Sequence, residues 1–149
     1  MSLRLSPNFT LHEMMRSNTG ERLNVDNRAT ANDINRLVIL SQYMERIREI
    51  FNRPIIVTSA FRSREINKLV GGAVNSDHLM GYAVDFKINS LSTVDICRSI
   101  YKSDLDYSQL IEEFGQWVHI SINPANKRQN LKAFKRNGRT FYSYTNFED

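Results

Sequence analysis

The sequence predicts an α+β fold in one small domain, with a central antiparallel sheet and helices packed on it. The chain has 149 residues, a length that suits a single core burying about two thirds of the surface of the unfolded chain. Helix-like and strand-like segments follow one another without the regular βα alternation of a doubly wound sheet. Two strands are joined by a tight connection. Residues 1–149 are therefore treated as one domain.

The first half of the chain contains two short helices, one long helix and a strand. "TLHEMMRS" has Thr10 and Glu13 in capping-box spacing, which predicts a short helix. A long helix is predicted from about residue 31 to 51, because apolar residues recur there at helical spacing and "NRP" stops it. "IIVTSAF" is β-branched and predicts a strand, and "SREINKLVGG" predicts a helix between a Ser63 cap and Gly71.

The second half of the chain is predicted to contain one helix and several strands, in which apolar and polar residues alternate. "YAVDFKI" is a strand by alternation, and "STVDICRSIYK" is a helix with Ser92 and Asp95 in capping positions. "SQLIEE" and "WVHISI" are two strands around the tight connection "FGQ", and "RTFYSYT" is a last strand.

Composition narrows the classes of protein to consider. No run of residues approaches the roughly 20 apolar residues of a membrane span, and the start "MSLRLSPNF" lacks the apolar region of a signal peptide. The lone Cys97 allows no internal disulfide. We therefore expect a protein made in the cytoplasm.

The net charge of +4 suits polyanions such as acidic wall polymers or nucleic acid, and it equally suits a solubilising surface. The basic stretch "NKRQNLKAFKRNGR" has no interleaved aromatic platform and matches no nucleic-acid-binding motif, so we expect no nucleic-acid partner.

Alternation also indicates where a metal site can lie. The aliphatic face of "YAVDFKI" leaves Asp85 on the other face, and the aliphatic face of "WVHISI" leaves His119 opposite. His78 lies seven residues before Asp85, in a glycine-containing loop. If the two strands share a sheet, these side chains can fill three tetrahedral positions of Zn²⁺ and leave the fourth for water. A solvated carboxylate and an ordinary sheet histidine are the alternatives, and spacing alone does not decide between them.

Several motifs, in the same order and spacing, resemble one known family. "SDHLMGYAVDF" resembles the Ser-x-His-x-x-Gly-x-Ala-x-Asp signature of the zinc D-Ala-D-Ala carboxypeptidase and LD-endopeptidase family of peptidoglycan peptidases, and "WVHIS" resembles its Trp-x-His motif. "FTLHEMMRS", "PIIVTSAFRS", "INKLVGGAVNS" and "QLIEEFGQWVHIS" are similar to the phage and bacterial branch of that family. The resemblance covers about residues 8–123 and leaves residues 124–149 unassigned.

The resemblance implies a Hedgehog/D-Ala-D-Ala-peptidase-like zinc fold and a metallopeptidase that hydrolyses an amide bond in the peptidoglycan stem peptide or cross-bridge. It implies that Zn²⁺ binds to His78, Asp85 and His119. It also implies that Arg62 holds a substrate carboxylate, for which a guanidinium is a planar match, and that Ser76 lines the same pocket. A surface arginine and a loop or cap hydroxyl are the alternatives for these two residues. Trp117 is a further candidate for the pocket wall, with core packing as the alternative.

The general base is the least conventional part of the implied site. Many relatives carry an acidic residue three positions before the last histidine ligand, where this chain has Gln116, whose amide cannot take a proton. We predict that Glu113 is the base, because it matches the glutamate of the closer branch, and that Glu112 points the other way. Asp77 and Tyr82 also depart from closer relatives, which affects the choice of substrate side chain more than the metal.

A non-catalytic function is the alternative. The same zinc fold resembles Hedgehog-type signalling domains, in which a comparable site need not mean peptidase action. The chain could then be a zinc-containing wall-binding or virion-structural module, a hypothesis that Gln116 favours and that Arg62 and Glu113 oppose. In either case we expect a monomer of phage-like or bacterial type. We expect it to act on the cell wall after its release from the cell or as part of a virion.

Overall fold

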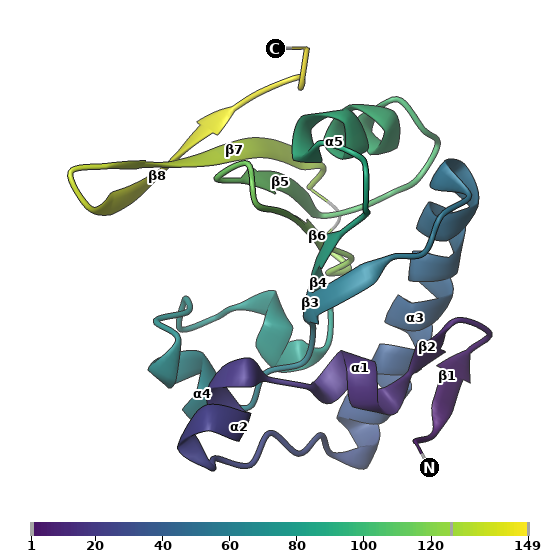
Figure 1. Cartoon of the computed structure of the whole chain (residues 1–149), viewed down its shortest axis with the longest axis vertical. Helices are drawn as coiled ribbons and strands as arrows, with labels where there is room; N and C mark the ends of the chain where they lie inside the picture. Colours follow the sequence, from purple (N-terminus) through teal and green to yellow (C-terminus); the bar gives the residue numbers. More distant parts are fainter. Residues whose placement is uncertain (1, 126, 149) are drawn as a thin grey trace.

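The computed structural model describes residues 2–125 and 127–148. Its helices are α1 (Leu11–Met15), α2 (Asn18–Leu23), α3 (Ala31–Phe51), α4 (Arg64–Leu69), the 3-10 helix η1 (Asp77–Met80) and α5 (Thr93–Tyr101) (Figure 1). Its strands are β1 (Arg4–Ser6), β2 (Phe9–Thr10), β3 (Ile56–Ser59), β4 (Ala83–Lys87), β5 (Gln109–Glu113), β6 (Trp117–Ser121), β7 (Gln129–Arg136) and β8 (Arg139–Tyr144). None of these helices is long and apolar enough to cross a membrane.

The main sheet has six strands in the order β3-β4-β6-β5-β7-β8, and β1 and β2 form a separate pair. The α+β class predicted from the sequence is confirmed, and the strand pairings of the sheet are antiparallel as predicted except for β5 and β7, which are parallel. The reason lies in the connection after β6. Ser121 at the end of β6 pairs with Gln109 at the start of β5, and Gln109 also pairs with Gln129 at the start of β7. The chain therefore enters β7 from the end of the sheet at which β5 begins.

Capping residues set the helix ends that the sequence predicts. Helix α3 begins after Thr30, whose side chain accepts from the backbone N–H of Asp33 in a capping box, and it ends at Asn52 in the left-handed conformation. The predicted boundaries of this helix, about 31 to 51, are confirmed. Ser63 and Ser92 cap α4 and α5, and their side chains accept from the backbone N–H groups of Ile66 and Asp95.

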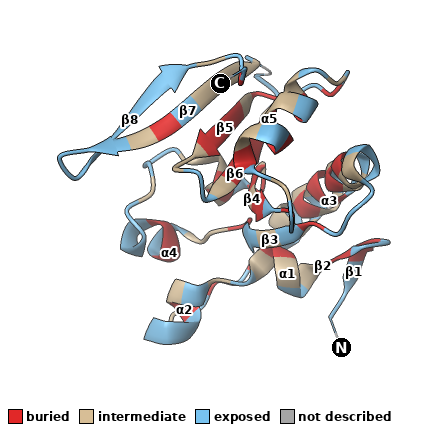
Figure 2. Cartoon of the chain, turned by 45° about the horizontal axis from the view of Figure 1, so that its top comes forward, coloured by how far each residue is buried: buried red, intermediate tan, exposed pale blue. Residues whose placement is uncertain are grey.

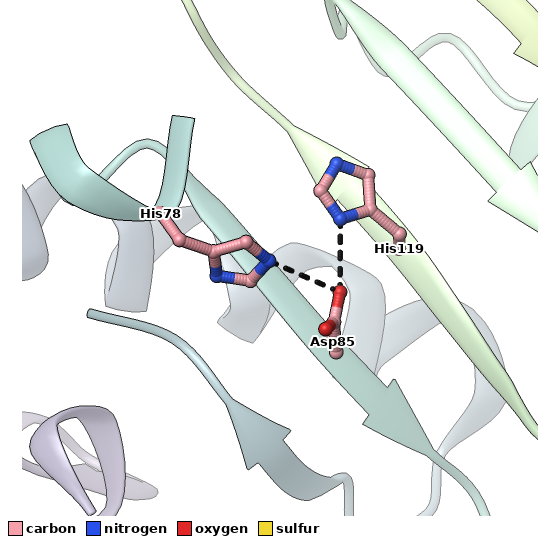
Figure 3. A group of neighbouring side chains, drawn as sticks. All are labelled: His78, Asp85 and His119. Carbon is pink, nitrogen blue, oxygen red and sulfur yellow. Dashed lines mark hydrogen bonds and ion pairs between the residues drawn. The ribbon is translucent and has the colours of Figure 1, made fainter. Parts of the chain in front are cut away.

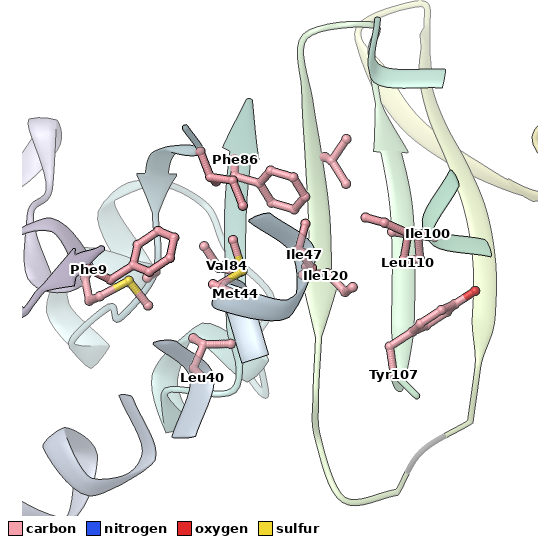
Figure 4. Packing of buried hydrophobic residues seen from close by; sticks show 14 of the residues in the cluster. Phe9, Leu40, Met44, Ile47, Val84, Phe86, Ile100, Tyr107, Leu110 and Ile120 are labelled. Atoms are coloured by element: carbon pink, nitrogen blue, oxygen red, sulfur yellow. The ribbon is translucent and has the colours of Figure 1, made fainter. Parts of the chain in front are cut away.

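The core lies on one face of the sheet, under α3 and α5 (Figures 2 and 4). Val84 and Phe86 of β4 and Val118 and Ile120 of β6 are fully buried there, as alternation predicts. They pack in one cluster with the buried side of α3, formed by Leu37, Leu40, Met44 and Ile47. Because the side chains of a strand alternate, burial of this face directs the other set of β4 and β6 side chains to the opposite face.

Several elements of the fold are not predicted from the sequence. Helix α2 lies in what reads as a polar stretch, and the strands β1, β2 and β7 have no prediction. Helix α2 has no helical period of apolar residues, and its start depends on the Ser17 side chain, which accepts from the Gly20 backbone N–H. Gly20 also packs where a Cβ would lie 2.8 Å from the Val25 carbonyl oxygen. Local backbone contacts therefore hold this helix.

The turn between β5 and β6 is held by a buried carboxylate. Glu112 is 2% exposed and, as predicted, lies on the opposite side of β5 from the polar cleft. Its Oε1 accepts from the Thr93 hydroxyl at 2.7 Å and from the Gly115 backbone N–H at 2.7 Å. Phe114 and Gly115 both have positive φ, which disfavours a phenylalanine. Glu112 therefore stabilises the turn that carries Glu113 into the cleft.

We expect Glu112→Ala to lower the free energy of unfolding by about 2–3 kcal/mol, because it leaves the Thr93 hydroxyl and the Gly115 N–H without their partner. Urea denaturation measures this change. Gln116→Ala, at an exposed residue of the same turn, is the control and should change the stability by less than about 0.5 kcal/mol. Equal stability of the two variants would contradict this role for Glu112.

Candidate metal centre

Three side chains from adjoining elements converge on one point. His78 comes from η1, Asp85 from β4 and His119 from β6, and the last two face each other directly in the antiparallel ladder (Figure 3). Asp85 Oδ1 lies 3.3 Å from His78 Nε2 and 2.9 Å from His119 Nδ1. One ligand atom from each residue lies within 4.8 Å of the others, so the group can hold a metal ion.

The geometry of these atoms suits zinc. Tetrahedral Zn²⁺ with bonds of about 2.0–2.1 Å holds its ligand atoms about 3.3 Å apart, close to the two separations above. The His78 Nδ1 lies 2.6 Å from the Ala60 carbonyl oxygen, which can only accept. That nitrogen therefore carries the proton, and Nε2 keeps a free lone pair toward Asp85 and His119.

Asp85 and His119 are strongly coupled. Burial alone raises the pKa of Asp85, but the charges and hydrogen bonds of the two imidazoles outweigh it and hold that pKa well below the ordinary range of an aspartate. Burial alone lowers the pKa of His119, and the hydrogen bond and charge of Asp85 turn the shift upward. A half-buried carboxylate thus faces two imidazoles, an environment that favours a cation.

The backbone around His78 is fixed by its neighbours in the sequence motif. Ser76 caps η1, and its hydroxyl accepts from the His78 backbone N–H at 3.2 Å. Gly81 ends η1 with a φ of 72°, a left-handed conformation that glycine adopts without strain. The chain can then turn directly into β4, which carries Asp85.

Asp77, a departure from the family pattern, ties the two halves of the centre together. Its carboxylate accepts from the Ser121 hydroxyl at 2.6 Å and from the Asn123 side-chain amide at 2.8 Å. η1, which carries His78, is thereby joined to the end of β6, which carries His119. Asp77 thus has a structural role that its position in the motif does not reveal.

The three ligands open into a cleft of about 700 Å³ on the polar face of the sheet. The residues predicted to serve the substrate are brought together in its lining: Arg62, Ser76, Glu113 and Trp117. Gln116 does not line this cleft within the described chain; it is exposed in the turn between β5 and β6. The roles predicted for the lining residues stay predictions.

Glu113 is a carboxyl group in unusual surroundings. Burial, followed by the charge of Asp85, raises its pKa to about 7, while His119 and Arg62 act in the opposite direction. A carboxyl group that titrates near neutrality can both accept and release a proton. A bound cation would lower this pKa again, because it favours the ionised form.

Arg62 lies beside the metal ligands. Its backbone N–H donates to the His78 carbonyl at 3.1 Å, and its Nε is buried without a hydrogen-bond partner in the described chain. Burial lowers the pKa of its guanidinium, and the carboxylates Asp85 and Glu113 counter that shift. The guanidinium of Arg62 has room because residue 72 is a glycine: a Cβ on Gly72 would lie only 2.9 Å from Arg62 Nη1. A buried donor without a partner is what a carboxylate-binding group provides.

Trp117 and Phe114 form one wall of the cleft. Their rings meet edge to face with 5.6 Å between centroids, and both residues are half-buried. The lining also includes residues of the C-terminal hairpin that the sequence analysis missed: Lys135, Thr140 and Tyr142. No motif marks them, because their position depends on how β7 and β8 join the sheet.

The comparison with known families agrees with this geometry. A family model described as Peptidase M15 matches residues 7–121, a range that includes all three metal-ligand candidates. No curated protein matches the chain significantly. Peptidases of the M15 family are zinc-dependent, and the His78, Asp85 and His119 group can hold that ion. The chain belongs to the M15 family of zinc D-Ala-D-Ala carboxypeptidase-like peptidases.

Proposed function

We propose that the protein is a zinc peptidase that hydrolyses an amide bond in the stem peptide or cross-bridge of peptidoglycan. The observation that carries this proposal is a three-ligand group in a cleft that also holds a carboxyl group and an unpartnered guanidinium. Zinc, when bound by His78, Asp85 and His119, supplies a Lewis acid for the scissile carbonyl and lowers the pKa of water. The other steps belong to side chains of the cleft.

Glu113 is the proposed general base. It pairs with Trp117 in the β5–β6 ladder, and His119 pairs with Ile111 two residues earlier on β5, so Glu113 and His119 share a face as diagonal neighbours. Diagonal neighbours are about 7–8 Å apart, which leaves space for a water molecule between a glutamate and the metal ligands. Glu113 would take the proton of this water and deliver it to the leaving nitrogen.

Arg62 is the proposed clamp for a substrate carboxylate. Its Nε has no protein partner in the described chain, and the planar guanidinium can bind both oxygens of a carboxylate. A terminal carboxylate held there would orient a peptide with its last amide bond toward the metal ligands. Ser76 and Trp117 would contact the same end of the substrate.

Arg62→Lys is expected to lower turnover of stem peptides with a free C-terminus by about tenfold or more, because a point charge does not replace the planar fork. Zinc content and melting temperature should stay near those of the wild type. Arg64→Lys, at an exposed position of α4, is the matched control. Normal cleavage by Arg62→Lys would show that the clamp is wrong or that the enzyme cuts within a chain and needs none.

Hydrolysis of synthetic peptides tests the reaction itself. The zinc-loaded protein should release fragments from a stem pentapeptide or a cross-bridge peptide, separated by chromatography. A chelator should stop the release, and added zinc should restore it. Release that continues in the chelator would exclude a metal-assisted reaction.

A zinc-containing wall-binding or virion-structural module is the second candidate, and the presence of Gln116 where many relatives carry an acid favours it. Gln116 is exposed and does not line the cleft in the described chain, whereas Glu113 does. This placement supports the enzyme. We further propose that the protein meets peptidoglycan after release from the cell in which it is made, or as part of a virion.

A further inference from the structure

The hairpin formed by β7 and β8 lies outside residues 7–121, which match the family model. It nevertheless extends the sheet that carries the metal ligands, because β7 pairs along its length with β5 (Figure 1). Three of its residues line the metal cleft: Lys135, Thr140 and Tyr142. The lining of the cleft therefore includes residues beyond the range that the family model matches.

The pairing of the strands determines which hairpin side chains face the cleft. Glu113 lies directly opposite Ala133 of β7, and Ala133 lies directly opposite Tyr142 of β8. Directly paired residues point to the same face, so these three form one row across the sheet. Lys135 and Thr140 are the next pair on that face. Ala133 is fully buried, so the larger residues on either side of it, Glu113 and Tyr142, are the members of this row that line the cleft.

The environment of Tyr142 agrees with this row. Partial burial, followed by the charges of Glu113 and Asp85, raises the pKa of its phenol. Tyr142 is 55% exposed and lines the cleft, so its protonated phenol is available there as a hydrogen-bond donor.

Lys135 brings a positive charge to the same region. It is exposed, it takes part in none of the ion pairs of the described residues, and its Nζ lies 5.6 Å from the centroid of the Phe114 ring. Residues 129–144 contain no acidic residue, so no carboxylate within the hairpin offsets its charge. The cleft therefore has a cation near each end, Arg62 after β3 and Lys135 on β7, with the metal ligands and Glu113 between them.

The spacing of the strands suits a peptide. From β6, which carries His119, to β7 there are two strand steps, or about 10 Å at the usual spacing of 4.7–4.9 Å. An extended peptide covers about 10 Å in three residues. A substrate held by Arg62 at one end would thus reach the hairpin about three residues from the scissile bond.

We propose that Lys135 and Tyr142 form a substrate subsite that binds a carboxylate-bearing residue about three positions from the scissile bond, on the side away from Arg62. This subsite rests on the proposed peptidase function. Lys135 attracts the carboxylate, and Tyr142 donates a hydrogen bond to it.

The test uses two peptides that differ in one charge: the pentapeptide L-Ala–γ-D-Glu–L-Lys–D-Ala–D-Ala, and the same peptide with the α-carboxyl group of its D-Glu amidated. Binding to the zinc-loaded protein is followed by stopped-flow fluorescence of Trp117, the single tryptophan, before turnover begins. The wild type should bind the acidic peptide about three- to tenfold more tightly than the amidated one.

Lys135→Glu should remove or reverse this preference. Lys132→Glu is the matched control, because it makes the same charge change on the same strand. Lys132 lies three residues before Lys135, so the alternation of the strand directs its side chain to the opposite face of the sheet. It should keep the wild-type preference. Tyr142→Phe should reduce the preference about two- to threefold through the loss of one hydrogen bond, with little effect on binding of the amidated peptide.

The subsite is overturned if the wild type shows no preference between the peptides, or if Lys135→Glu and Lys132→Glu show the same preference. These outcomes are separate from a failure of the proposed function. A wild type that prefers the acidic peptide through Lys135 but never cleaves it would retain the subsite and contradict the peptidase.

Discussion

Glu113→Gln is expected to lower peptide hydrolysis by about 10²–10⁴, the usual contribution of a positioned acid–base group. The substitution keeps the size of the side chain and removes the proton acceptor. Because Glu113 is not one of the three metal-ligand candidates, zinc content should stay near that of the wild type. Steady-state rates on a stem peptide, with zinc measured in each sample, give the comparison.

Gln116→Ala is the control for this prediction. Gln116 occupies the position that is acidic in many relatives, but it is exposed in the turn and does not line the cleft of the described chain. Its loss should change the rate by less than about threefold, because its amide cannot take a proton. Full activity in Glu113→Gln would show that Glu113 is not the base. A large loss of activity in Gln116→Ala would show that the turn between β5 and β6 takes part in the reaction.

Removal of a metal ligand is the second change for which we expect a large effect. The wild type should retain about one zinc ion per chain, and His119→Ala should reduce it far below one, because two remaining ligands form an incomplete coordination shell. The same result is expected for His78→Ala and Asp85→Ala. Zinc is measured by mass spectrometry of the metal after dialysis.

The third histidine of the chain provides the matched control. His12 lies in α1 and is not part of the metal-ligand group, so His12→Ala should keep the full zinc content. Stoichiometric zinc in the His119→Ala protein would show that the ion is bound elsewhere.

The metal ligands were predicted from strand alternation, for Asp85 and His119, together with the resemblance of their motifs to a known family, which also supplied His78. Once the aliphatic faces of β4 and β6 are buried, the period of a strand leaves Asp85 and His119 on the other face. The pairing of these two residues directly across the ladder is an additional fact that only the structure supplies. The same rule predicted correctly that Glu112 and Glu113 lie on opposite sides of β5.

The parts that were not predicted depend on contacts distant in sequence. The strand β7 has few apolar residues to mark it: "QNLKAFKR" alternates only weakly, and Ala133 is a poor strand former. Its parallel pairing with β5 follows from the course of the preceding loop, which no local pattern encodes. Without that pairing, Lys135 and Tyr142 could not be placed in the cleft. The structural role of Asp77 was hidden for the same reason, because its partners Ser121 and Asn123 lie on another strand end.

The most direct test of the proposed activity is mass spectrometry of purified peptidoglycan after incubation with the protein, in its zinc-loaded form and after removal of zinc. A zinc peptidase should release fragments whose masses identify one cleaved amide bond, and those fragments should be missing when zinc is removed. A protein that binds the peptidoglycan and releases no fragment in either form would contradict the peptidase and favour the wall-binding module.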